Sequence, residues 1–173
     1  MAFNQSMTVP LELKLTATAE GPRLTYTPVR ELEKLREKSY RLNGVKVSPG
    51  GVNPLAKVRG DGLELRAEFA PGDATEVIFE VRGATIAYDV RKQELSVNGH
   101  RAPAPLRHGR QSLTILCDRT GLEVFASDGL TYIPKPYQPK PDDLAASVQV
   151  KGGAVTFQKL QAYRLGSIWE SRR

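Results

Sequence analysis

Residues Leu113–Ile133, LTILCDRTGLEVFASDGLTYI, hold three apolar runs separated by two short polar segments. In the first run every second residue from Leu113 to Cys117 is apolar, and a period of two is typical of a strand with one buried face. DRTG (118–121) and SDG (127–129) are turn sequences, because Asp accepts backbone N–H groups and Gly tolerates positive φ. The stretch therefore predicts three consecutive strands joined by tight turns.

The same alternation recurs along the rest of the chain. It is present in LELKLTA (11–17), LELRAEF (63–69), VIFEV (77–81), TIAYDV (85–90), SVQV (147–150) and AVTFQKLQAYRL (154–165). Turn sequences separate these runs: RGDG (59–62), APGD (70–73), RG (82–83), NG (98–99) and KGG (151–153). Many short strands at this spacing, each with one apolar face, predict an all-β fold, a two-sheet antiparallel β-sandwich.

One segment interrupts the strand pattern. Pro28 precedes VRELEKLREKS, in which Leu32 and Leu35 are spaced to lie on one helical face. Proline is well tolerated at a helix start, because its missing N–H would be unpaired there. We expect one short helix over residues 29–37. The Pro-rich segments 101–106 and 133–141 are expected to be surface loops.

Composition limits the classes of function. A chain of 173 residues and 19.0 kDa is the size of one domain. The formal net charge is +6, but acidic residues alternate with basic ones, as in RELEKLREK (30–38), so we expect no nucleic-acid partner. No apolar run approaches the roughly 20 residues that span a bilayer, and MAFNQSMTVP (1–10) lacks the features of a signal peptide, so we expect no membrane partner.

The sequence contains no motif for a metal site, a disulfide or a cofactor. Cys117 is the single cysteine, and the two histidines, His100 and His108, stand alone in Gly- and Pro-rich surroundings. We interpret both histidines as exposed loop residues and expect neither a metal nor another cofactor. Cys117 alternates with Leu113 and Ile115, which favours a buried apolar role over a nucleophilic one.

The three carboxylates of the opening stretch could be structural or catalytic residues. Asp118 and Asp128 fall at turns, which predicts local hydrogen bonds to the backbone. Glu123 lies on a strand between apolar neighbours. If its face is buried, it needs a partner, for which Arg119 is a candidate; if its face is exposed, it is an ordinary surface residue. A catalytic role is the third alternative, but a retaining glycosidase needs two carboxylates about 5–5.5 Å apart across a pocket.

The opening stretch resembles the hallmark hairpin in the C-terminal β-sandwich of glycoside hydrolase family 32, which includes levanases, inulinases and invertases. The positions that match the family pattern are Leu113, Asp118, Glu123, Phe125, Asp128 and Gly129. Thr120 and Ser127 depart from it, since Ser and Asn are usual there. Three further segments are similar to the family: FNQSMTVPLELKL (3–15), PVRELEKLREKSYRL (28–42) and LQAYRLGSIW (160–169). The first of these looks most like the levanase and fructan β-fructosidase branch.

The resemblance implies what the chain contains and what it lacks. Family members carry their catalytic Asp, Asp and Glu in a five-bladed β-propeller, and none of the propeller motifs occurs here. We therefore expect no catalytic residue in this chain. The implied boundaries are a remnant of the propeller-to-sandwich connection at 1–10 and the C-terminal sandwich domain at 11–173. The parent enzyme would be secreted or periplasmic, although no signal in the chain indicates it.

The leading hypothesis for function is a non-catalytic accessory domain that packs on the propeller of a fructan-cleaving hydrolase. One outer face should then be unusually apolar, with Phe3 and Met7 as first candidates. The alternative is a free-standing carbohydrate-binding module that stacks fructan or oligosaccharide rings on Tyr132, Tyr137 and Trp169. Self-association through a sheet edge or face is a third hypothesis.

Overall fold

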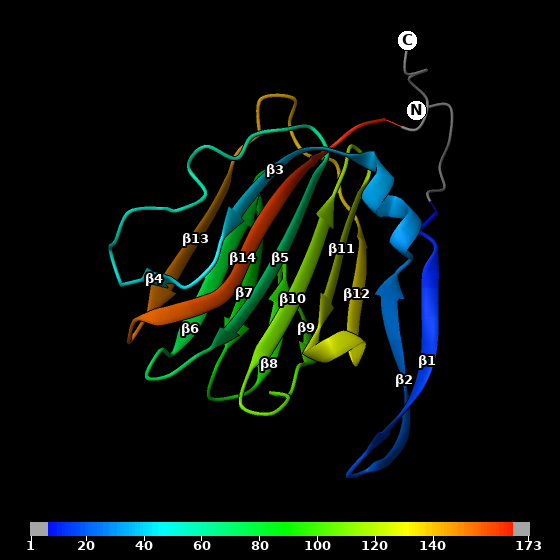
Figure 1. The fold of residues 1–173 in the computed structure, drawn as a ribbon, viewed down its shortest axis with the longest axis vertical. Helices are drawn as coiled ribbons and strands as arrows, with labels where there is room; N and C mark the ends of the chain where they lie inside the picture. The colour runs from blue at the N-terminus through cyan, green and yellow to red at the C-terminus, as the bar shows by residue number, and fades with distance from the viewer. Residues whose placement is uncertain (1–6, 168–173) are drawn as a thin grey trace.

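Strands dominate residues 7–167, the part of the chain that the computed structural model describes. Two sheets pack face to face, and a separate two-stranded hairpin stands beside them (Figure 1). The first sheet has the order β12-β11-β10-β5-β14-β3, with β4 also paired to β14. Its strands are β3 (Arg36–Leu42), β4 (Val45–Val47), β5 (Leu63–Ala70), β10 (Gln111–Cys117), β11 (Gly121–Ala126), β12 (Thr131–Pro136) and β14 (Val155–Leu165).

The second sheet lies behind the first in Figure 1 and has the order β13-β6-β7-β8-β9. Its strands are β6 (Glu76–Val81), β7 (Ala84–Asp89), β8 (Glu94–Val97), β9 (His100–Pro103) and β13 (Ala146–Lys151). The hairpin consists of β1 (Leu11–Thr18) and β2 (Gly21–Pro28). All strand pairs in these sheets are antiparallel, so the predicted fold class, an all-β antiparallel sandwich, is confirmed.

The core lies between the two sheets. Alternate residues of each strand point inward, as β5 illustrates with Leu63, Leu65, Ala67 and Phe69, all buried. Phe157 of β14 lies at its centre, with its ring centroid 5.1 Å from that of Phe69 and 6.2 Å from that of Phe79. Edge-to-face and tilted ring packing of this kind adds to the stabilisation from apolar burial.

The predicted helix is present but shorter than expected. A 3-10 helix, η1, spans Arg30–Leu35, and Arg36 already begins strand β3 with φ −72° and ψ 115°. Residues 36 and 37 therefore contradict the expected range of 29–37. The cause is a tertiary contact, because the Arg36 side chain is held by Glu64 on β5 and its backbone is drawn onto the sheet.

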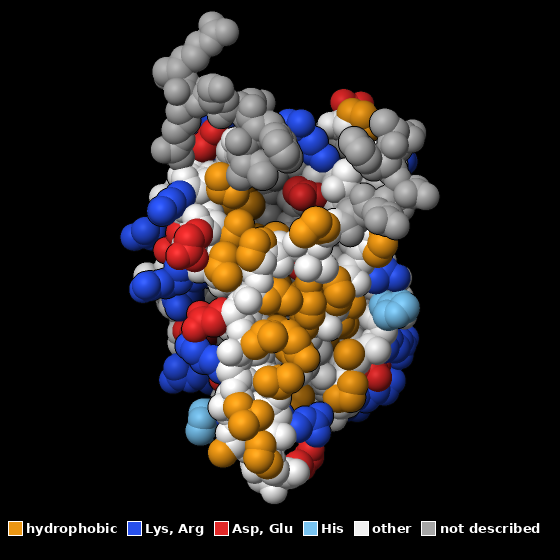
Figure 2. Space-filling model, turned by 90° about the vertical axis from the view of Figure 1, so that its right-hand side faces the viewer, with side chains coloured by type: hydrophobic (Ala, Val, Ile, Leu, Met, Phe, Trp, Pro, Cys, Tyr) orange, Lys and Arg blue, Asp and Glu red, His pale blue; other side chains and the backbone are white. Residues whose placement is uncertain are grey.

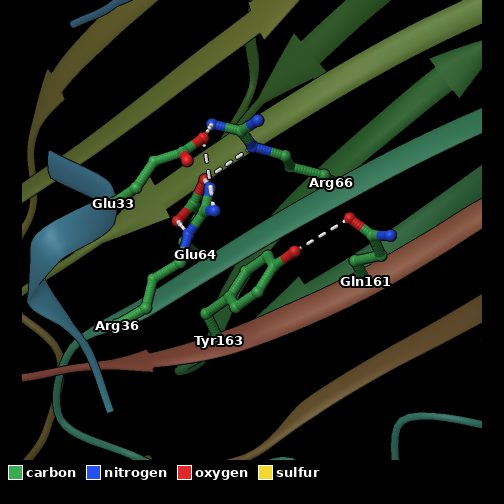
Figure 3. A network of polar contacts seen from close by, with 6 residues as sticks. All are labelled: Glu33, Arg36, Glu64, Arg66, Gln161 and Tyr163. Carbon is green, nitrogen blue, oxygen red and sulfur yellow. Dashed lines mark hydrogen bonds and ion pairs between the residues drawn. The ribbon is translucent and has the colours of Figure 1, made fainter. Parts of the chain in front are cut away.

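Five charged and aromatic side chains close η1 onto the outer face of the first sheet (Figure 3). Glu64, whose side chain is 4% exposed, accepts Arg36 Nε at 2.7 Å, Arg36 Nη2 at 2.6 Å and Arg66 Nε at 2.6 Å. Glu33 of η1 lies 3.3 Å from Arg36 and 3.4 Å from Arg66. The Arg36 guanidinium also stacks on Tyr163, 3.9 Å from the ring centroid. Both glutamates are thus engaged by arginines, which gives the cluster a structural role.

The Pro-rich segments are partly strands, which corrects their expected loop character. Pro103 ends β9, and Pro134 and Pro136 lie in β12. Both strands are at the edge of their sheets, where a residue without an N–H costs no ladder hydrogen bond. A second 3-10 turn, η2 (Ser127–Gly129), joins β11 to β12. No helix within residues 7–167 is long and apolar enough to cross a membrane.

Candidate functional site at the N-terminal anchor

Glu123 projects from the outer face of β11 and is only 8% exposed. Its Oε1 accepts the backbone N–H of Val9 at 2.8 Å, and its Oε2 accepts the hydroxyl of Tyr132 in a short hydrogen bond. The expected partner, Arg119, is wrong, since Arg119 pairs with Asp61 at 2.9 Å. We call Glu123, Tyr132 and Val9 the N-terminal anchor, because they fix the chain just before β1.

Tyr132 is stacked between two other rings. Its centroid is 4.6 Å from that of Phe125, with 16° between the planes, and 5.8 Å from that of Tyr26 on β2, with 25° between the planes. Burial raises the pKa of Tyr132 above its ordinary value, and the hydrogen bond to Glu123 raises it further. Its hydroxyl is therefore a donor at neutral pH, and both of its ring faces are occupied by neighbouring side chains.

The two motif aspartates at the turns differ. The side chain of Asp118 binds the local backbone, as predicted, whereas the side chain of Asp128 binds the side chain of Ser112 on β10, which contradicts the predicted local backbone bond. Asp118 Oδ1 accepts the N–H groups of Thr120 and Gly121, each at 2.7 Å. Asp128, at φ 56°, accepts the Ser112 hydroxyl at 2.7 Å and donates its own N–H to that hydroxyl at 2.8 Å.

Gly129 of η2 makes the closest approach to the hairpin. Its φ is +87°, and a Cβ added there would lie 2.6 Å from the carbonyl oxygen of Tyr26. Only glycine fits this position without displacing β2. The turn after β11 is therefore shaped to receive the β1–β2 hairpin.

The other two aromatic candidates lie elsewhere. The Tyr137 hydroxyl donates to the carbonyl of Arg82 at 2.8 Å, at the turn between β6 and β7, and its ring packs against the core. Trp169 lies outside the described residues. Tyr132 and Tyr137 thus occupy different parts of the surface, and each is engaged in packing.

Cys117 is buried on the inner face of β10. Burial raises the pKa of its thiol to about 12. A neutral, inaccessible thiol is a poor nucleophile, so the predicted apolar role is confirmed. His100 and His108 are both exposed, as expected, but His100 begins strand β9 and is not the loop residue that the sequence predicted.

Exposed leucines lie on the outer face of the hairpin. Leu13 faces Tyr26 across the ladder and Leu15 faces Leu24, so these side chains share one face. Leu13, Leu15 and Leu24 are 56%, 71% and 49% exposed, and we call them the leucine face. Figure 2 shows hydrophobic side chains gathered along this side of the molecule, with charged ones mainly at its margins.

Two further features adjoin the hairpin. Met7, one of the two residues expected on an apolar face, is exposed; Phe3, the other, lies outside the described residues. An open hollow of about 590 Å³ is lined by Leu11, Glu12, Lys14 and Val29, together with the first residues of η1. Glu12 is paired with Lys14 at 3.0 Å there.

Comparison with known proteins gives the family of this chain. The family described as "Glycosyl hydrolases family 32 C terminal" matches residues 31–164. The chain is 32% identical to a levanase of Bacillus subtilis over 96% of its length, and 25% identical to a fructan beta-fructosidase of Streptococcus mutans over 99%. These matches span 28% and 14% of the two relatives, so the chain corresponds to a small part of each.

Solved structures share the fold. An exo-inulinase from Aspergillus awamori superposes with a TM-score of 0.79 over 94% of this chain and 36% of its own, at 18% identity. A fructofuranosidase from Schwanniomyces occidentalis gives 0.69, over 91% of this chain and 40% of its own, at 12% identity. The family match covers more than half of the chain and contains the β10–β11–β12 hairpins. The chain therefore belongs to glycosyl hydrolase family 32, of which it represents the C-terminal domain.

Proposed function

We propose that this chain is the non-catalytic accessory β-sandwich of a levanase-like, fructan-hydrolysing glycosidase, and that it packs on and stabilises the catalytic β-propeller. The N-terminal anchor carries the proposal. Glu123 and Tyr132 of the hallmark hairpin are directed at Val9 and Tyr26, the chain that enters the sandwich, and not at an open pocket. A sandwich whose motif residues hold the incoming chain is suited to position a module that is joined to it through this segment.

The chemistry of the described side chains fits a non-catalytic role. Glu123 has both carboxylate oxygens engaged, and Glu64 accepts three hydrogen bonds from arginines. A general acid or base must reach a proton of the substrate from a pocket. The propeller, which the resemblance to the family implies, would supply the nucleophile and the acid/base in the parent enzyme. We also propose that residues 1–10 are a remnant of the connection from the propeller and that residues 11–173 form the C-terminal sandwich domain.

Sugar binding by Tyr132, Tyr137 or Trp169 is the alternative function. Stacking a fructose ring on Tyr132 would require displacing Phe125 or Tyr26 from its faces. Titration of the purified chain with levan and inulin oligosaccharides tests this directly. Heat release that disappears in Tyr137→Ala, or in Tyr132→Ala, would favour the alternative over the accessory role.

An immunoprecipitation from the source cells, with an antibody against this domain, tests the accessory role. We expect the precipitated protein to be much larger than 19.0 kDa and to hydrolyse β-fructosides, whereas the purified 173-residue chain should not. A precipitate that contains only a 19.0 kDa protein and no hydrolase activity would refute the proposal. Hydrolysis of levan, inulin or sucrose by the purified chain would refute its non-catalytic part.

A further inference from the structure

The leucines on one face of the β1–β2 hairpin are exposed, although Tyr26 on the same face stacks on Tyr132 of the sandwich. Leu13, Leu15 and Leu24 are each about half exposed or more, although an isolated two-stranded hairpin is at best marginally stable in water. Large aliphatic side chains that gather on one face of such an element are expected to be covered in the functional protein. Within residues 7–167 these three side chains remain open to solvent.

The hairpin is held in a defined position. Thr25, on the face opposite the leucines, is buried; its contacts with Thr16 Oγ1 at 3.4 Å and with the carbonyl of Lys14 at 3.3 Å lie within the hairpin and join β2 to β1. Tyr26 stacks on Tyr132, and its backbone lies directly against Gly129. Contacts with η2 and β12 therefore fix the position of the hairpin, so the leucine face is exposed in an ordered element.

We propose that the leucine face is the contact surface for the catalytic module of the parent enzyme, and that it meets a small apolar patch of that module. This inference rests on the proposed accessory function. The N-terminal anchor supplies the continuity, because Glu123 holds Val9 only two residues before β1 begins at Leu11. A module joined at this point starts at one end of the hairpin, where β1 begins (Figure 1), and Leu13 and Leu15 follow along that strand.

The size of the face favours a tethered module over a second copy of this chain. Eight residues per strand at about 3.3 Å each, and two strands about 5 Å apart, give a face of roughly 250 Å². A stable interface between separate molecules buries about 800 Å² on each partner. A covalently joined module needs far less, since its effective concentration at the face is on the order of millimolar.

A paired substitution tests the inference in the isolated chain and in the intact enzyme obtained by immunoprecipitation. The test variant is Leu13→Gln/Leu15→Gln. The matched control is Val52→Gln, because Val52 is 91% exposed and belongs to the segment between β4 and β5, which lies on the opposite side of the sandwich from the hairpin in Figure 1. In the isolated chain both variants should melt like the wild type, and the leucine variant should bind less of a hydrophobic dye.

In the intact enzyme the two variants should separate. We expect the half-life of β-fructosidase activity near the melting temperature to fall roughly fivefold or more in the leucine variant, and to stay within about twofold in Val52→Gln. If the intact enzyme outlasts its isolated catalytic module but the leucine variant equals the wild type, the inference is wrong and the accessory function stands.

Two other outcomes would overturn the inference in different ways. If the intact enzyme is no more stable than its catalytic module alone, the accessory function fails together with the inference. If the isolated chain sediments as a dimer, and Leu13→Gln/Leu15→Gln makes it a monomer, the face belongs to a second copy of this chain. Half-lives and sedimentation together therefore distinguish failure of the accessory function, failure of the leucine-face inference and dimerisation of this chain.

Discussion

The carboxylate of Glu123 accepts the backbone N–H of Val9 at 2.8 Å across a sequence separation of 114 residues. This bond joins the hallmark hairpin of the sandwich to the point at which the chain enters it. Glu123 holds Val9 and Tyr132 together, and Tyr132 in turn stacks on Tyr26 of the hairpin. The anchor thus couples the position of residues 7–28 to the first sheet.

Glu123→Gln should loosen this anchor. The amide keeps the size of the side chain, but it loses the charge and turns an NH₂ group toward one of two hydrogen-bond donors. We expect the free energy of unfolding to fall by about 1–2 kcal/mol and the Val9 amide to exchange faster with solvent. Thermal melts and hydrogen-exchange NMR measure the two effects. Glu12→Gln, on the exposed hairpin surface, is the control and should change stability by less than about 0.5 kcal/mol. Unchanged protection of Val9 would contradict the role given to Glu123.

Gly129→Ala should displace the hairpin. The new Cβ would lie 2.6 Å from the carbonyl oxygen of Tyr26, in addition to the strain of φ +87°. Gly99→Ala is a matched control, since Gly99 has φ +81° but no atom within 4 Å of an added Cβ. We expect about 1 kcal/mol of destabilisation in the control, from backbone strain alone, and clearly more in Gly129→Ala. Equal denaturant midpoints for the two variants would mean that the clash with Tyr26 is relieved without cost.

Arg36→Met should be the most destabilising of these changes. Among the residues drawn in Figure 3, it leaves Arg66 as the only cation that contacts the buried Glu64 carboxylate. Burial acts to lower the pKa of Arg36, but the hydrogen bond and charge of Glu64, helped by Glu33 and Tyr163, raise it above its ordinary value. We expect a loss of about 3 kcal/mol by urea unfolding. The exposed pair of Arg23 and Glu20 provides a control, Arg23→Met, with little effect.

A double-variant cycle with Glu64→Gln isolates the contact itself. Once Glu64 is neutral, removing Arg36 should cost much less than it does in the wild type. Additive effects of Arg36→Met and Glu64→Gln would show that the two side chains stabilise the fold independently of each other.

Cys117 should make the domain less stable at high pH. Its thiol has a pKa of about 12 in the fold, against an ordinary value of 9.0 when unfolded. Between these values the unfolded chain holds fewer protons than the folded one, so the free energy of unfolding falls as pH rises from about 9 to about 12, by up to about 1.4 kcal/mol per pH unit. Cys117→Ala should show a shallower fall over that range. Identical slopes for the two proteins would contradict the burial of the thiol.

The alternation of apolar and polar residues predicted the sandwich because each strand of a sandwich buries one of its two faces. LELRAEF was expected to be a strand over residues 63–69, and β5 spans Leu63–Ala70. The same pattern in LELKLTA predicted a strand with a buried leucine face, and here β1 forms while its leucines stay exposed. Periodicity shows that a face is apolar, but it does not show whether the covering surface lies in the same chain.

The interactions that the sequence did not predict are long-range ones. Arg119 was the expected partner of Glu123 because it is close in sequence, whereas the actual partners are a backbone N–H at Val9 and the Tyr132 hydroxyl. A backbone donor carries no residue-type signal. The helix expected over residues 29–37 ends at Leu35, because Glu64 on β5 holds Arg36 in an extended conformation. In both cases a tertiary contact outweighs the preference of the local sequence: the N–H of Val9 binds Glu123 from 114 residues away, and Glu64 holds Arg36 from β5.

The position of β14 has a consequence for how the domain is made. This strand is the last one within residues 7–167, yet it lies inside the first sheet, between β5 on one side and β3 and β4 on the other. During synthesis β3, β4 and β5 leave the ribosome long before their shared neighbour exists, so the first sheet can be completed only after translation has passed Leu165. Nascent chains that stop before this strand would expose the core faces of both layers and become substrates for chaperones and proteases. The eleven-residue strand β14 thus completes the first sheet only after the strands on both sides of it have been synthesised.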